Sequence, residues 1–241
     1  VGRERAAGGL DPAALQSLLG DWPTTETQAL AVQEALRERV LRSDNLPSEP
    51  RFIAGVDVAY ARDESVVCAG IAVIDAATLG LVETRSAMRP VEFAYAPALF
   101  ALRELPAVLQ ALAGVSTPID LLVCDGHGIA HPRRFGLASH LGVLLDLPCI
   151  GAAKSRLIGS HGELAGARGS SVPLFDGDEV IGAVLRTQRD VRPIYVSIGH
   201  RIALPTAVSW VQRLCPHHRL PESTRQADQL VKRLLREAVA A

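Results

Sequence analysis

The order of apolar and polar positions predicts strands in the first half of the chain and alternating helices and strands in the second. Three apolar runs separated by short polar turns predict an antiparallel meander at Phe52–Tyr60, Val66–Asp75 and Leu81–Met88. Shorter apolar runs predict further strands at Ile119–Cys124, Pro148–Ala153, Val180–Arg186 and Ile194–Ile198. We therefore expect an α/β protein built on one mixed β-sheet flanked by helices.

Helices are predicted where apolar residues recur with helical spacing behind a capping residue or a proline. These segments are Thr24–Arg42, Pro97–Leu112, Gly136–Leu145, Pro205–Leu214 and Glu222–Ala240. Pro106 lies inside the second of them and should kink or divide it, because proline has no backbone N–H to donate. The glycine-rich segment Ser160–Ser171 is predicted to be a loop. We expect a single domain over residues 24–241, preceded by an N-terminal extension over residues 1–23.

Composition narrows the class of protein without identifying an activity. Hydrophobic residues make up 48% of the 241 residues, which is enough for a packed core. No apolar run reaches the length of about 18 residues needed to span a membrane, and no basic-then-apolar leader opens the chain. The four cysteines are scattered and contain no Cys-x-x-Cys pair, so we expect reduced thiols in a cytoplasmic protein.

Charge gives one specific signal. The net charge of −1 neither supports nor excludes nucleic-acid binding, because basic residues can gather on one face. Of the 25 basic residues, however, only Lys154 and Lys232 are lysine. Lysine and arginine are not equivalent where a compact ammonium group is needed. Lys154, in the run Gly151–Arg156, is therefore either a functional cation or a chance choice at the surface.

Two aspartates occupy positions that a buried strand normally excludes. Asp57 interrupts an otherwise apolar run, and Asp125 ends another. A buried carboxylate has to be paired, protonated or bound to metal, although a strand-end aspartate such as Asp125 can simply form a turn. Together the two could hold a hard divalent cation, with Glu104 and Asp228 joining from helices. Taken alone, Glu104 and Asp228 are equally compatible with exposed helix faces.

The segment that follows Asp125 favours a loop that approaches nucleic acid. His127 and His131 are four residues apart, but Gly126, Gly128 and Pro132 disfavour the helix that a zinc site of this spacing would need. Backbone N–H groups at Gly126, His127 and Gly128 could approach a phosphate or a base closely. The adjacent side chains that could reach a nucleic-acid backbone are His131, Arg133 and Arg134.

Several segments together resemble the endonuclease V family. They occur in the family's order over roughly residues 25–230, and they are Ala54–Asp57, Arg103-Glu104, Asp125–Arg133, Gly151–Lys154, Gly199–Arg201 and Leu220–Asp228. The stretch Asp125–Arg134 is the most specific of them. The resemblance implies an RNase H-like fold and a Mg²⁺-dependent cut of DNA at the second phosphodiester bond 3′ to deoxyinosine, with Mn²⁺ as a substitute metal.

The resemblance also implies roles for individual residues. Asp57, Glu104 and Asp125 become the acidic metal site, and Asp228 becomes an additional acid from the last helix. His131 and Lys154 become polar residues beside the scissile phosphate, and Tyr95 takes the place of the family's wedge tyrosine. Bacterial members have Pro-Tyr-Ile-Pro around that tyrosine, whereas this chain has Ala94-Tyr95-Ala96-Pro97. This difference predicts a less rigid wedge.

Two other functions are compatible with the same fold. One is a ribonuclease that acts on inosine in RNA, which would differ in how it treats the 2′-hydroxyl group. The other is a nucleic-acid-binding module without catalysis, which the presence of all the motif acids argues against. We expect a monomer that binds DNA containing deoxyinosine or other deaminated or mismatched bases, and no membrane partner.

Overall fold

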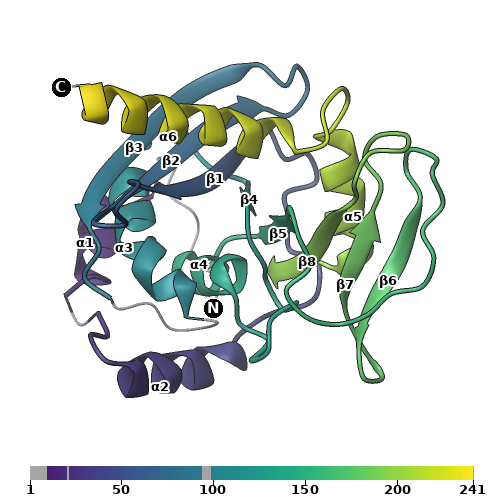
Figure 1. Cartoon of the computed structure of the whole chain (residues 1–241), viewed down its shortest axis with the longest axis horizontal. Helices are drawn as coiled ribbons and strands as arrows, with labels where there is room; N and C mark the ends of the chain where they lie inside the picture. Colours follow the sequence, from purple (N-terminus) through teal and green to yellow (C-terminus); the bar gives the residue numbers. More distant parts are fainter. Residues whose placement is uncertain (1–9, 21, 94–98, 241) are drawn as a thin grey trace.

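The strands of the chain form one mixed sheet in a computed structural model that describes residues 10–20, 22–93 and 99–240 (Figure 1). In spatial order the eight strands are β3 (Leu81–Pro90), β2 (Val66–Asp75), β1 (Phe52–Tyr60), β4 (Leu121–Cys124), β5 (Cys149–Ala153), β8 (Ile194–His200), β7 (Glu179–Leu185) and β6 (Ser171–Asp176). The strands β1, β2 and β3 pair in antiparallel fashion, which confirms the predicted meander. The mixed sheet with flanking helices is likewise confirmed.

Parallel pairing at the centre of the sheet brings polar residues together. Strand β4 pairs in parallel with both β1 and β5, and Val56 lies opposite Cys124. The residues that follow this pair, Asp57 and Asp125, are therefore neighbours at the C-terminal end of β4, near the centre of the sheet. The backbone N–H of Asp125 donates to the carbonyl of Val56 at 2.9 Å, which holds the two chains together at this level.

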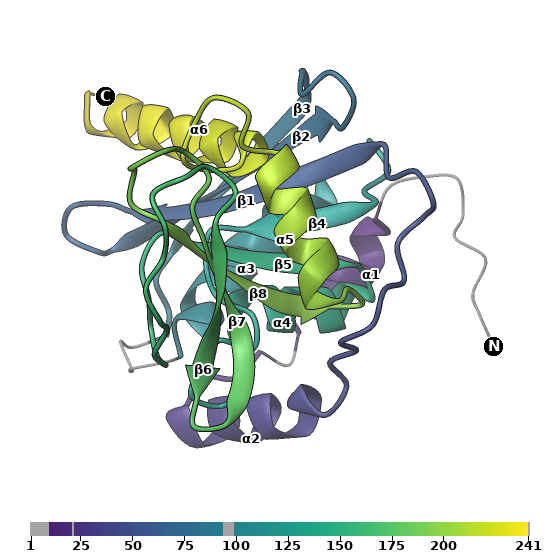
Figure 2. The same cartoon turned by 90° about the vertical axis from the view of Figure 1, so that its right-hand side faces the viewer.

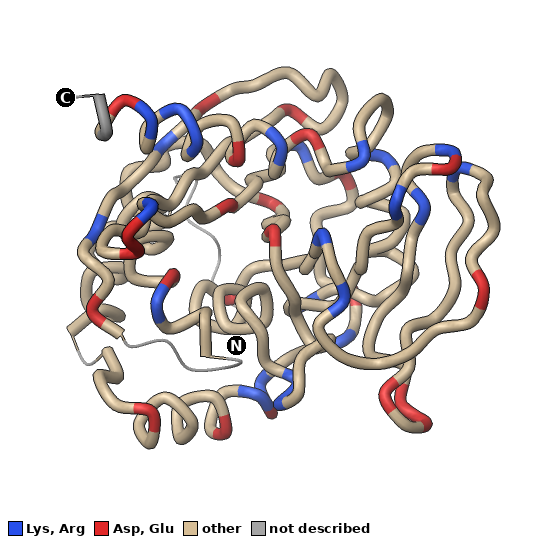
Figure 3. The backbone as a smooth tube through the Cα atoms, viewed as in Figure 1, with Lys and Arg blue, Asp and Glu red and all other residues tan. Residues whose placement is uncertain are grey.

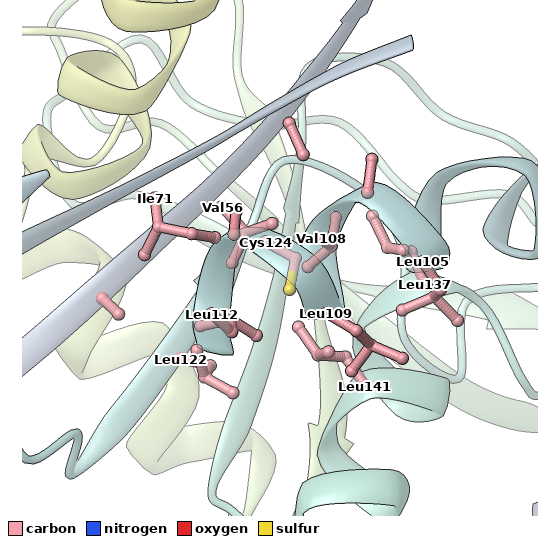
Figure 4. Packing of buried hydrophobic residues seen from close by; sticks show 14 of the residues in the cluster. Val56, Ile71, Leu105, Val108, Leu109, Leu112, Leu122, Cys124, Leu137 and Leu141 are labelled. Atoms are coloured by element: carbon pink, nitrogen blue, oxygen red, sulfur yellow. The ribbon is translucent and has the colours of Figure 1, made fainter. Parts of the chain in front are cut away.

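Helices cover both faces of the sheet. The helices are α1 (Pro12–Ser17), α2 (Glu26–Arg37), α3 (Phe100–Ala113), α4 (Leu137–Leu145), α5 (Leu204–Arg213) and α6 (Glu222–Ala240). Helices α3 and α4 pack on one face, where Val56, Leu109 and Leu122 belong to the largest apolar cluster (Figure 4). Helix α6 crosses β1 and β2, and α5 lies beside β7 and β8 (Figures 1 and 2).

The close approach of α6 depends on a glycine in β1. A Cβ atom at Gly55 would overlap the backbone of Ser223, in the first turn of α6. Side chains alternate between the two faces of a strand, so Asp57 points to the same side of the sheet as Gly55. That side carries α6, and with it Asp228.

Part of the predicted N-terminal extension packs against the domain. Leu15 of α1 is 3% exposed and belongs to the main apolar cluster, in which α3 is the principal partner of α1. Burial of one leucine side chain stabilises the folded state by about 1.5–3 kcal/mol. The described part of the extension is thus bound to the helix that carries Glu104.

The structure corrects three predictions about secondary structure. The helix predicted from Pro97 begins at Phe100, and Leu99 precedes it in a non-helical conformation. Pro106 was expected to kink or divide this helix, and it does not divide it, because the helix runs from Phe100 to Ala113. Strand β6 was not predicted, because Pro173 and the flanking polar residues conceal the short alternation that buries only Leu174. As an edge strand, β6 tolerates a proline that lacks a ladder hydrogen bond.

No helix within the described ranges combines the length and the apolar character that a membrane span needs.

Candidate active site

Asp57 and Asp125 form a buried carboxyl pair at the centre of the sheet. The Asp57 side chain is almost enclosed, and the residue is 6% exposed. Burial, followed by the hydrogen bond that it shares with the Asp125 carboxyl group, raises the pKa of Asp57 from 3.8 to about 8. Two adjacent carboxyl groups cannot both ionise freely without a nearby positive charge. Asp57 therefore favours its protonated form at neutral pH, although the nearby charge of Lys154 lowers its pKa.

Lys154 brings a positive charge into this acidic group from the residue after β5. Its ammonium group contacts the Asp125 carboxylate, lies 3.7 Å from Asp57 Oδ1 and donates to Asp228 Oδ1 at 3.2 Å. Although partial burial opposes its charge, the surrounding carboxylates keep the pKa of Lys154 above its usual value. The three aspartates come from β1, from the end of β4 and from α6. Only the folded chain brings them to one ammonium group.

Asp228 also binds the second lysine of the chain. Lys232 Nζ donates to Asp228 Oδ2 at 2.7 Å, one helical turn further along α6. Partial burial alone would raise the pKa of Asp228, but the hydrogen bonds from Lys232 and Lys154 outweigh it and lower that pKa. Asp228 is thus an ionised bridge between the chain's two lysines. Lys232 was not expected to make this contact, although its i,i+4 spacing from Asp228 could have indicated it.

Glu104 lies on the α3 side of Asp125. Burial raises the pKa of Glu104 from 4.5 to about 7, while a hydrogen bond from the Tyr60 hydroxyl (3.3 Å) lowers it and the charge of Asp125 raises it. The Arg103 guanidinium group lies over the Tyr60 ring, 5.0 Å from its centroid. Tyr60 was not predicted as a site residue, and an aromatic residue at a strand end gives no sequence signal for such a role.

A cavity of about 260 Å³ joins Glu104 and Asp125 to the loop that follows β4. Its lining combines apolar and polar side chains: Phe100, Ala101, Glu104, Asp125, Gly126, His127, His131, Gly136, Leu137, Ser155, Arg156 and Leu157. Pockets for drug-sized ligands usually measure about 300–1,000 Å³. This cavity is therefore suited to a smaller, ring-sized group that enters beside the acids.

The two histidines of the loop both line the cavity. Burial lowers the pKa of His127 from 6.5 to about 4, so its imidazole is neutral at physiological pH. His131 is 4% exposed, and its Nδ1 atom accepts a hydrogen bond from the backbone N–H of Arg133 at 3.2 Å. Both rings are held in place, and the zinc interpretation of the pair is not supported, because the loop is not helical.

Two residues expected to contact nucleic acid have partners within the protein. The Gly128 N–H donates to Ser197 Oγ at 2.8 Å, and a Cβ atom at Gly128 would overlap the Ile198 carbonyl group. This N–H group already has a partner in the protein, and contact of Gly128 with nucleic acid stays a prediction. Arg134 binds Asp176 and Glu179, both at 2.7 Å, and so connects the loop to the β6–β7 hairpin.

The remaining predicted contacts have different outcomes. Arg133 Nε donates to Gln33 Oε1 of α2 at 2.5 Å. Gly126 lies in the predicted loop and lines the cavity. A Cβ atom there would make only ordinary contacts with Leu137. Tyr95, together with Ala94 and Ala96, lies outside the described residues. Acidic and basic residues are interspersed along the backbone in the view of Figure 3.

The donors of the site suit a hard divalent cation, which prefers oxygen ligands. Within the described ranges, no three His, Cys, Asp or Glu side chains are arranged as a ready metal site. The aspartates instead surround the Lys154 ammonium group, and Asp57 shares a hydrogen bond with Asp125. The carboxylates already contact one positive charge, that of Lys154. The raised pKa of Asp57 indicates that this single charge does not balance the negative charge of the site. A divalent cation would supply the missing charge.

Comparison with known proteins places the chain in a family. The sequence profile of endonuclease V matches residues 34–229. Endonuclease V of Nostoc sp. is 51% identical over 209 residues, which cover 87% of this chain and 95% of that protein. The crystal structure of endonuclease V from Streptomyces avermitilis matches with a TM-score of 0.85 and 48% identity, covering 91% of this chain and 96% of that one.

A further match has bound nucleic acid. Ciona intestinalis endonuclease V, solved in complex with a 24mer DNA that contains an inosine followed by a ribo-adenosine, matches with a TM-score of 0.76 and 26% identity. The match covers 88% of this chain and 98% of that one. Profile, identity and fold agree over most of the chain. It belongs to the endonuclease V family, whose members are metal-dependent DNA endonucleases with an RNase H-like fold.

Proposed function

We propose that this chain nicks DNA at the second phosphodiester bond 3′ to deoxyinosine, with Mg²⁺ as the metal and Mn²⁺ as a substitute. The observation that carries the proposal is the cluster of Asp57, Asp125, Asp228 and Lys154 beside a ring-sized cavity. Family membership supports the reaction class, and the inosine-containing DNA bound by the Ciona relative supports the substrate.

In this proposal the acids of the site hold the metal. Asp57 and Asp125 are neighbours, and Glu104 approaches Asp125 from α3, so the three can supply oxygen ligands from two sides. A bound divalent cation would activate water and stabilise the charge that develops on the phosphate. Asp57 would lose its proton when it binds a metal, because only ionised carboxylates are good ligands.

Lys154 and His131 would act on the substrate phosphate. The Lys154 side chain is 38% exposed, so a substrate phosphate could approach it from the solvent side. A fixed positive charge beside a phosphate stabilises the additional charge of the transition state. His131, held by the Arg133 N–H, would donate a hydrogen bond from its other ring nitrogen. Asp228 orients Lys154 through its 3.2 Å contact.

The cavity would receive the extruded inosine base. An inosine mismatch lowers the cost of removing a base from the stack, which is at most a few kcal/mol. Phe100 and Leu137 offer apolar surface to a flat ring, and neutral His127 and the backbone around Gly126 offer polar contacts. Tyr95 stays a prediction: as a wedge, it would fill the gap that the base leaves in the duplex.

The proposal is tested by cleavage of matched oligonucleotides. Purified protein is incubated with Mg²⁺ and duplexes that differ only by inosine or adenine at one position, and the product ends are mapped. We expect a nick two phosphodiester bonds 3′ to inosine, loss of cleavage in EDTA and no cleavage of the adenine duplex. Asp125→Asn should abolish cleavage, whereas Asp178→Asn, the same change at an exposed hairpin turn, should not.

A parallel arm uses an inosine-containing RNA of the same sequence. Faster cleavage of this RNA than of the DNA would replace the proposed substrate with RNA, and absence of cleavage in both arms would refute the proposal.

A further inference from the structure

Helix α3 contains a proline that leaves one backbone carbonyl without its helical donor. In an α-helix the carbonyl of residue 102 accepts from the N–H of residue 106, and residue 106 here is proline. Leu102 is fully buried, so water does not replace the missing donor easily. The proline ring also crowds the carbonyl four residues earlier and tilts it away from the helix axis. An outside donor is therefore needed at this point of α3.

Trp22 supplies that donor from 80 residues away. Its indole Nε1–H donates to the Leu102 carbonyl oxygen at 3.0 Å. The ring is fixed from two sides, because it stacks on His140 of α4 (centroids 5.9 Å apart, interplanar angle 18°) and packs against the cluster that contains Leu102. Trp22 precedes the part of the chain that the family profile matches, residues 34–229. Its contact therefore joins a residue before the profile match to helix α3 inside it.

The turn of α3 that Trp22 completes is the turn that carries Glu104. This residue lies between Leu102 and Pro106, and it directs its carboxyl group to Tyr60 and toward Asp125. A helix that bends at a proline can take a range of angles unless the freed carbonyl is fixed. A small change in that angle would move the Glu104 carboxyl group relative to Asp57 and Asp125.

We propose that Trp22 is a positioning residue for Glu104: its N–H replaces the donor that Pro106 lacks and so fixes the direction of the Glu104 side chain toward the acids. This inference rests on the proposed role of Glu104 as a metal ligand. It assigns the N-terminal segment a part in the site, through one hydrogen bond and without contact with the substrate.

A double-mutant cycle isolates this hydrogen bond. Trp22→Phe removes the N–H and keeps an aromatic ring, while Pro106→Ala restores the helical donor to Leu102. Trp210→Phe, at the chain's other tryptophan, is the matched control on α5. For each protein we would measure kcat and KM with inosine duplex, and also the Kd for Mn²⁺ by electron paramagnetic resonance without DNA. Glu104→Gln, measured alongside, tests the proposed role of Glu104 itself.

We expect Trp22→Phe to lower kcat about 5- to 20-fold and to weaken Mn²⁺ binding several-fold, with KM for the duplex changed less than 2-fold. This range corresponds to a misplacement of a catalytic group by a fraction of an ångström. The double variant Trp22→Phe/Pro106→Ala should match Pro106→Ala in both measurements, because Leu102 then has its own helical donor. Trp210→Phe should match the unaltered protein.

The possible failures are distinct. Unchanged kcat and Mn²⁺ affinity in Trp22→Phe, or equal impairment in the single and the double variant, would overturn the positioning role. Full cleavage and normal Mn²⁺ binding by Glu104→Gln would instead overturn the proposed metal role of Glu104. A loss of thermal stability in Trp22→Phe, with both site measurements unchanged, would make the contact purely structural and also overturn the inference.

Discussion

Replacement of Lys154 by methionine separates two effects of its ammonium group, which should change in opposite directions. In the metal-free protein this group contacts Asp57, Asp125 and Asp228, and a divalent cation has to compete with it for the same carboxylates. A pair of unit charges at the 3.2 Å distance to Asp228 is worth about 5 kcal/mol at an effective dielectric constant of about 20. The Lys154 side chain is 38% exposed, so water screens this energy substantially.

Solvent-exposed ion pairs are worth about 0.2–1 kcal/mol each, so the three contacts together oppose the metal by up to about 3 kcal/mol. Each 1.4 kcal/mol corresponds to about a tenfold change in affinity. Lys154→Met should therefore bind Mn²⁺ about 10- to 100-fold more tightly than the unaltered protein. Cleavage should nevertheless fall about 10²- to 10³-fold, because the charge beside the phosphate is lost. The affinity is measured by Mn²⁺ titration without DNA, and cleavage is measured by single-turnover kinetics at saturating metal.

Lys232→Met is the matched control for this experiment. Lys232 also binds Asp228, but its side chain is 62% exposed and it does not contact Asp57 or Asp125. We expect less than a threefold change in Mn²⁺ affinity for this variant. Weaker or equal Mn²⁺ binding by Lys154→Met would refute competition between the ammonium group and the metal. Normal cleavage by Lys154→Met would show that the charge of this lysine has no role in catalysis.

Three further predictions concern stability and DNA binding. The pKa of Asp57 is raised from 3.8 to about 8 in the metal-free protein. This shift makes a contribution to the free energy of unfolding that is fully present below about pH 4 and is lost as the pH rises to 8. Asp57→Asn should remove this loss. The free energy of unfolding of each metal-free protein is measured by urea denaturation at several pH values between about 4 and 8. The same dependence on pH in both proteins would contradict the prediction. Gly128→Ala should lower the free energy of unfolding by about 3 kcal/mol because its methyl group would overlap a backbone oxygen of β8, whereas Gly126→Ala, with 3.4 Å to the nearest side chain, should be nearly neutral. Arg134→Ala should leave the salt dependence of DNA binding unchanged, since Arg134 binds Asp176; a slope reduced by about one would show a phosphate contact.

Local sequence patterns were sufficient for most of the secondary structure. Strands β1 and β2 and helix α6 have the predicted bounds, because each depends on apolar spacing along one continuous segment. The predictions failed where a neighbour in space overrides the local preference. Pro106 would disrupt an isolated helix, but in the folded chain Trp22 binds the carbonyl that the proline leaves free. Strand β6 likewise depends on pairing with β7 rather than on its own composition.

For the site, the sequence by itself determined which residues were candidates. Asp57 stood out because a carboxyl group in an apolar strand is costly, and the segment after Asp125 identified the family. Lys154 stood out as one of two lysines in an arginine-rich chain. Each of these signals depends on the chemistry of a residue and its immediate neighbours in the sequence.

The tertiary structure alone decided what these candidates contact. Parallel pairing of β1 with β4 makes Asp57 and Asp125 neighbours, and the packing of α6 over Gly55 brings Asp228 to Lys154. Asp57 and Asp125 are 68 residues apart, and Lys154 and Asp228 are 74 residues apart, so no local spacing encodes these contacts. The direction of the Arg134 side chain is fixed in the same way, by acids on a hairpin that comes 42 to 45 residues later. Residue identity sets which charges are present. Only the packing of distant segments sets the distances between these charges, and electrostatic energies depend on those distances.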